Sequence, residues 1–145
     1  MKTFNFKNVQ QPSYEPLPED RYDVEVVEIT KGSTTAGDVM LNIKFNVVKG
    51  LESDDKYAGR VLWANMSLGQ NAIGFFKLFL DAVGSDLAEG EDVTLDDLCN
   101  DLIGKRASCM AQIGTTPAGK SKNDLRYWKA IEGSGAQDSN INLIR

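Results

Sequence analysis

Residues 105–131 combine positive charge with aromatic side chains, in a chain whose formal net charge is −5. This stretch contains one acid, Asp124, and six bases. The bases are Lys105, Arg106, Lys120, Lys122, Arg126 and Lys129, and the aromatic residues include Tyr127 and Trp128. Cations attract phosphates and aromatic rings stack on bases, so the combination is typical of a surface that binds single-stranded nucleic acid. The sequence therefore predicts a polyanion partner. The alternative is a solvated hairpin tip, because charged runs commonly face solvent.

The acidic residues are concentrated in the preceding stretch, residues 81–104. That stretch holds eight acids and no base. Its charge would repel a phosphate backbone, so we predict that it faces away from the nucleic acid. Together with the negative net charge, this segregation favours one binding face over a uniformly basic surface.

The chain contains no histidine. This absence removes histidine-activated serine or cysteine nucleophiles, histidine general bases and histidine-ligated zinc. The neighbouring carboxylates Asp96 and Asp97 would point about 100° apart on a helix and would not converge on one metal ion. They fit a helix start better, with Thr94 as the N-cap and Asp97 in the capping-box position. We predict a protein without catalytic activity, metal or cofactor.

The length of 145 residues and the hydrophobic content of 41% predict a single globular domain. Cys99 and Cys109 are expected to be free, buried thiols. No apolar window approaches the ~18 residues of a membrane helix, and the first residues lack the apolar core of a signal peptide. These features predict a cytoplasmic protein that does not enter a membrane.

Alternation of apolar and polar residues predicts strands over residues 21–30 and 39–49, and a third strand after Gly59 and Arg60. Two helices are expected over residues 70–83 and 94–103, ending at Gly84 and Gly104. Further strands are predicted over residues 105–113 and 125–131.

This order of elements predicts a mainly β protein with helices. It is the order of the oligonucleotide/oligosaccharide-binding (OB) fold, a five-stranded Greek-key barrel with a helix between strands 3 and 4. Strands 2 and 3 form the binding surface of that fold, and the flanking loops would here be residues 31–38 and 114–123. A generic α+β sheet with a helix pair uses the same elements and is the alternative.

The domain would extend over residues 21–132, after an extended N-terminal arm at residues 1–20. Residues 133–145 are expected to form a flexible tail that is rich in Gly, Ser and Asn. Ile141, Leu143 and Ile144 near its end could dock on a sheet edge of the same or another subunit, or the tail could simply be a frayed terminus.

Trp63 is the strongest candidate for base stacking, because alternation places it on the polar face of the third strand, beside Asn65. A packing contact against the helix is the alternative. Among the cations, Lys44 and Arg60 join the six bases of residues 105–131 as candidate phosphate contacts. Alternation in the last strand predicts that Arg126 and Trp128 share one face and that Tyr127 and Lys129 share the other. Five further aromatic residues are assigned to packing, namely Phe45, Tyr57, Phe75, Phe76 and Phe79.

Four short motifs occur in an order and spacing that resemble a bacteriophage family first catalogued as of unknown function. They are Leu17-Pro18-Glu19-Asp20-Arg21-Tyr22, Thr35-Ala36-Gly37-Asp38, Leu41-Asn42-Ile43-Lys44-Phe45-Asn46-Val47 and Tyr57-Ala58-Gly59-Arg60. Members of that family look like single-stranded-DNA-binding proteins with an OB-like fold, often encoded beside recombination and replication genes. The resemblance covers about the first 84 residues well. The tail departs from such proteins, because it has one acid after residue 132 and ends on Arg145.

The sequence thus predicts a sequence-independent single-stranded-DNA-binding protein that acts in phage DNA replication or recombination, in the cytoplasm of an infected bacterium. RNA binding, self-association and contacts with replication or recombination proteins are compatible with the same surface. The alternative from another class is a structural or adaptor protein of a phage particle, which would use the same barrel as an assembly module.

Overall fold

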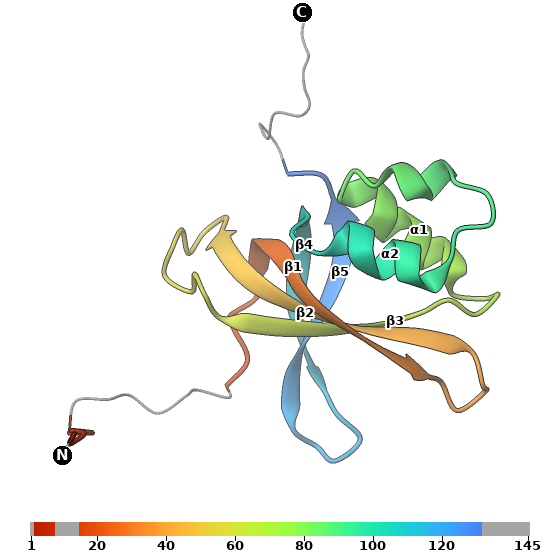
Figure 1. The fold of residues 1–145 in the computed structure, drawn as a ribbon. Coiled ribbons are helices and arrows are strands. Elements are labelled where there is room, and N and C mark those ends of the chain that lie inside the picture. The colour runs from red at the N-terminus through yellow and green to blue at the C-terminus, as the bar shows by residue number, and fades with distance from the viewer. Residues whose placement is uncertain (1, 8–14, 132–145) are drawn as a thin grey trace, which may run out of the picture.

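The computed structural model describes residues 2–7 and 15–131, and the predicted tail lies outside these residues. Five antiparallel strands form one sheet in the order β3-β2-β1-β4-β5, with three helices between β3 and β4 (Figure 1). The elements are β1 (Asp20–Ser33), β2 (Val39–Gly50), β3 (Val61–Ser67), α1 (Ile73–Ala82), the 3-10 helix η1 (Asp86–Glu89), α2 (Leu95–Leu102), β4 (Arg106–Thr115) and β5 (Ser121–Lys129). The predicted mainly β class and the helices between the third and fourth strands are confirmed.

The core lies on one face of the twisted sheet, and strand alternation builds it. Every second residue of β1 from Tyr22 to Val26, and of β2 from Leu41 to Val47, is buried. Burying each such side chain contributes about 1.5–3 kcal/mol, which fixes the strand register. The small residues Ala107, Cys109 and Ala111 continue this face into β4.

Helix α1 covers the core through Phe76, Phe79 and Leu80. Not all apolar residues of this helix face the core, because Phe75 is 74% exposed and Ile73 is 50% exposed. Only one side of a helix can contact the sheet, and residues next to the contacting ones rotate away by about 100° each. The assignment of Phe75 to the core is therefore wrong, whereas those of Phe76 and Phe79 are confirmed.

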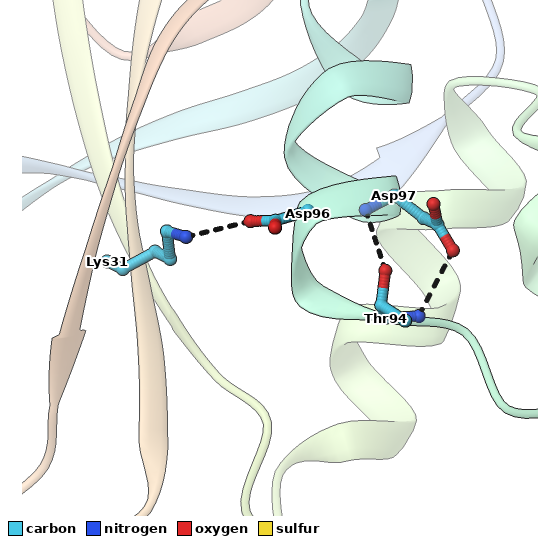
Figure 2. Close-up of polar contacts among 4 residues, drawn as sticks. All are labelled: Lys31, Thr94, Asp96 and Asp97. Carbon is cyan, nitrogen blue, oxygen red and sulfur yellow. Dashed lines mark hydrogen bonds and ion pairs between the residues drawn. The ribbon is translucent and has the colours of Figure 1, made fainter.

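Helix α2 begins with the predicted capping box. The Thr94 side chain accepts a hydrogen bond of 3.1 Å from the Asp97 N–H, and the Asp97 carboxylate accepts one of 3.3 Å from the Thr94 N–H (Figure 2). Lys31 of β1 donates to Asp96 at 3.0 Å, so the acidic helix is tied to the β1–β2 hairpin (Figure 2). Lys31 was predicted in a loop, but β1 continues to Ser33.

The connection from β2 to β3 is anchored on one buried carboxylate. Asp20 accepts hydrogen bonds from the Ser53 hydroxyl at 2.9 Å and from the N–H groups of Arg21, Glu52 and Ser53. Burial alone would raise the pKa of Asp20, but these hydrogen bonds outweigh it and lower that pKa. Gly50 permits the arrangement, since a Cβ there would lie 2.6 Å from the Asp20 Oδ2.

Both cysteines are free thiols, as predicted. Cys109 is fully buried, and burial raises its pKa to about 12, whereas Cys99 is half-buried. Within the part of the chain that the structure describes, no helix is both long and apolar enough to cross a membrane.

Candidate nucleic-acid interface

A cleft of about 870 Å³ opens between β3 and β5. The residues that line it come from β3 and the two residues before it, from β2, from the first part of β5 and from the segment before β1. They are Glu15, Pro16, Asn42, Gly59, Arg60, Val61, Leu62, Trp63, Ala64, Asn65, Ser121, Lys122, Asn123, Asp124, Leu125 and Arg126. The β4–β5 hairpin, whose second strand supplies one wall, projects away from the helices (Figure 1).

Trp63 lies on the outer face of β3 and is 48% exposed, as strand alternation predicts. Its cross-strand neighbour on β2 is Lys44, whose Nζ lies 5.8 Å from the centroid of the indole ring. This cation–π contact brings a cation and an aromatic ring onto one patch. A base stacked on Trp63 would therefore have a phosphate-binding group within reach.

Two asparagines, Asn42 and Asn65, lie opposite each other two cross-strand pairs further along β2 and β3. Their side-chain amides are hydrogen-bonded to each other, and both residues line the cleft. They were not predicted as site residues, although the same alternation that exposes Trp63 places them beside it. Each carboxamide has donor and acceptor capacity left for a ligand.

Three of the predicted cations line the cleft, namely Arg60, Lys122 and Arg126. Lys122 forms an ion pair of 2.8 Å with Asp124, whereas Arg126 is exposed and has no ion pair among the described residues. Because Glu15 and Asp124 also line the cleft, the cations exceed the acids by only one. The positive charge available to a ligand in the cleft therefore depends on the neighbouring Lys44 and on whether Lys122 points toward the ligand or toward Asp124.

The segment before β1 crosses one end of the cleft. Arg60 donates to the Glu15 carbonyl at 2.8 Å, on the side of β3. On the side of β5, the Asn123 side chain donates to the Leu17 carbonyl at 3.0 Å and accepts from the Leu17 N–H at 2.8 Å. Asn123 was assigned to a loop, but β5 already begins at Ser121, and this places its amide opposite the buried Leu17.

The other predicted cations lie outside the cleft. Arg106 pairs with Glu25 of β1 at 2.8 Å, and Lys105 pairs with Asp101 of α2 at 3.8 Å. Lys120 is exposed in the turn of the β4–β5 hairpin, and Lys129 is exposed at the end of β5. The basic stretch seen in the sequence is thus divided in the fold, and of its six bases Lys122 and Arg126 line the cleft together with Trp63.

The predicted pairing of faces in the last strand is wrong. A β-bulge shifts the register between the pairs Ser108–Lys129 and Met110–Arg126, and Tyr127 adopts a left-handed φ of 56°. The extra residue returns Trp128 to the core side, where its ring centroid lies 4.9 Å from that of Phe79. Arg126 faces the cleft and Tyr127 is 65% exposed. Trp128 is therefore a packing residue in this structure.

Tyr57 also packs, as predicted, with its ring centroid 6.5 Å from that of Tyr22.

No protein-family model matches the chain, and no curated protein matches it in sequence.

Proposed function

We propose that the cleft between β3 and β5 binds single-stranded DNA without sequence preference. The observation that carries this proposal is the half-exposed Trp63, which lies against Lys44 and lines the cleft together with Arg60, Lys122 and Arg126. Stacking of one base on such a ring contributes about 1–3 kcal/mol for any base. Sequence-independent binding is proposed because stacking on an aromatic ring does not distinguish one base from another.

The strand order supports an OB-like barrel as the architecture behind this function. In that fold, strands 2 and 3 bind oligonucleotides or oligosaccharides. Here β2 and β3 supply Lys44 and Trp63, and β5 supplies the opposite wall. The gap between β3 and β5 would correspond to the partly open seam of such a barrel.

The biological setting is proposed from the resemblance to phage single-stranded-DNA-binding proteins. A protein of this kind would cover DNA during phage replication or recombination, without catalytic activity, metal or cofactor, in the cytoplasm of the infected bacterium. Replication and recombination proteins would then be its partners. Single-stranded RNA offers the same stacking surfaces and phosphates, so its affinity has to be measured beside that of DNA.

Fluorescence anisotropy with labelled oligonucleotides tests the proposal. Oligo-dT should bind more tightly than a duplex of the same length, because a duplex does not present its base faces. Three to four neutralised phosphates predict that log K falls with log salt with a slope of about −2 to −3. Equal affinity for duplex and single strand would contradict stacking, and indifference to salt would contradict phosphate contacts. An oligo-U control of equal length measures the preference for DNA over RNA.

A second candidate function is an adaptor or structural role in a phage particle. The observation that favours it is the exposed apolar surface of α1, where Ile73, Phe75 and Leu78 are each at least 50% exposed. Exposed apolar patches of this kind often mark protein contacts. Sedimentation velocity over a range of concentrations, on the wild type and on Phe75→Ser with Leu78→Ser, would show whether this surface mediates self-association. A wild type that stays monomeric at every concentration contradicts self-association through α1.

A further inference from the structure

The short N-terminal segment at residues 2–7 carries a second set of aromatic and basic side chains. Phe4 is 69% exposed and Phe6 is 73% exposed, and their ring centroids lie 6.3 Å apart with an angle of 25° between the planes. Lys2 lies over the Phe4 ring, with its Nζ 5.6 Å from the centroid. The Asn5 carboxamide accepts from the Lys7 N–H at 2.9 Å, which is a local turn that any short polar residue of this type supports.

The charge of this segment suits a polyanion. Residues 1–14 contain Lys2 and Lys7 and no acid, although the whole chain has a net charge of −5. The Lys2 ammonium over the exposed Phe4 ring repeats the combination found at Trp63 and Lys44, and Lys7 adds a second positive charge to the segment. In water the exposed rings gain nothing from burial, whereas a stacked base would cover them.

The connection to the body of the protein starts at the cleft itself. Glu15 is bonded to Arg60 through its carbonyl, and Leu17 is held by Asn123, so the chain leaves the domain at the cleft rim. Seven residues separate Lys7 from Glu15. The eight Cα–Cα steps from Lys7 to Glu15 span at most roughly 29 Å and the eleven steps from Phe4 span at most roughly 40 Å, which keeps the aromatic pair within several nucleotides of the cleft.

We infer that Phe4 and Phe6, with Lys2 and Lys7, form a second contact site for single-stranded DNA, which binds the part of the strand that extends beyond the cleft. This inference rests on the proposed function of the cleft. Phe4 and Phe6 would stack on bases, and the two lysines would contact phosphates on either side of them. The site adds length to the footprint, so it acts only on a strand long enough to leave the cleft.

The test compares two oligo-dT lengths on the full chain, near the ends of the range of about 4–16 nucleotides that one OB-type site covers. The variant Phe4→Ala with Phe6→Ala should lose about tenfold in affinity for the longer strand and keep its affinity for the shorter one. Lys2→Gln with Lys7→Gln should make the salt slope for the longer strand less negative by about 1.4. Phe75→Ala is the matched control, because Phe75 is 74% exposed on α1, whose side chains do not line the cleft.

Two results would overturn the inference while leaving the proposed function intact. One is an unchanged affinity of the Phe4 and Phe6 variant at both lengths, with Trp63→Ala still weakening both. The other is an equal loss at both lengths, which would mean that the segment acts on the cleft and not on a distant nucleotide. If the wild type binds neither strand, the proposed function fails and the inference fails with it. If this segment instead binds a protein, the Phe4 and Phe6 variant keeps its DNA affinity at both lengths, and the inference is overturned.

Discussion

The two tryptophans occupy opposite environments. Trp63 is 48% exposed beside Lys44, whereas Trp128 packs against Phe45 and Phe79. Trp63→Ala should therefore weaken oligo-dT binding by about 1–3 kcal/mol and remove most of the quenching of tryptophan fluorescence, with little effect on the free energy of unfolding. Trp128→Ala should instead lower the free energy of unfolding by about 3–5 kcal/mol. Fluorescence titration and urea unfolding of both variants measure the difference. Normal quenching in Trp63→Ala would exclude stacking on that ring.

Lys122 and Asp124 form an ion pair inside the cleft, so their removal should have opposite effects on DNA binding. Asp124→Asn releases Lys122 for phosphate and removes a repulsive charge, which should strengthen binding by about 1 kcal/mol. Lys122→Gln should weaken binding by a similar amount and make the salt slope less negative by about 0.7. Anisotropy titrations at two salt concentrations check both values. Asp86→Asn is the control, because it changes the net charge equally from η1. Equal strengthening in that control would mean that only overall charge matters.

Among the elements, the strands and the position of Trp63 could be predicted from the sequence because apolar and polar residues alternate over Tyr22–Val26 of β1, Leu41–Val47 of β2 and Leu62–Met66 of β3. The bulge in β5 could not, since Tyr127 adopts a left-handed φ of 56° without being glycine, and nothing in the local pattern marks the extra residue. That one residue decides whether Trp128 faces the cleft or the core. Similarly, which cations of residues 105–131 reach the cleft depends on partners that are distant in sequence. Arg106, for example, forms an ion pair with Glu25. Composition alone does not specify such pairs.

The β2–β3 connection depends on Asp20, whose pKa is lowered in the folded protein by its hydrogen bonds, although burial opposes this. The ionised carboxylate therefore contributes stability that is fully present above its ordinary pKa of 3.8 and is lost as the pH falls through the lower folded value. Asp20→Asn should lower the free energy of unfolding at neutral pH by about 2 kcal/mol. It should also reduce the loss of stability during acidification.

Thermal unfolding of the wild type and Asp20→Asn between neutral pH and pH values below 3.8 measures this effect. Asp55→Asn is the matched control, because Asp55 lies in the same connection and is exposed. An identical pH dependence in the wild type and Asp20→Asn would show that the Asp20 hydrogen bonds contribute nothing to stability.

Across the whole molecule, the acidic helices and the cleft are separated. Residues 81–104 comprise the end of α1, η1, α2 and their connections, and the β4–β5 hairpin that borders the cleft projects away from the helices (Figure 1). Lys31 and Lys105 lie near this acidic region and are paired with Asp96 and Asp101. A bound strand should therefore follow the cleft and avoid the helices, because the helices carry a surplus of negative charge.

Amide hydrogen exchange with and without oligo-dT measures which residues a bound strand covers. We predict slower exchange at residues 59–65 of the β3 side and residues 121–126 of β5, with α1 and α2 unchanged. Protection confined to the helices, or to the region of Lys105 and Arg106, would contradict the assignment of the cleft as the binding site.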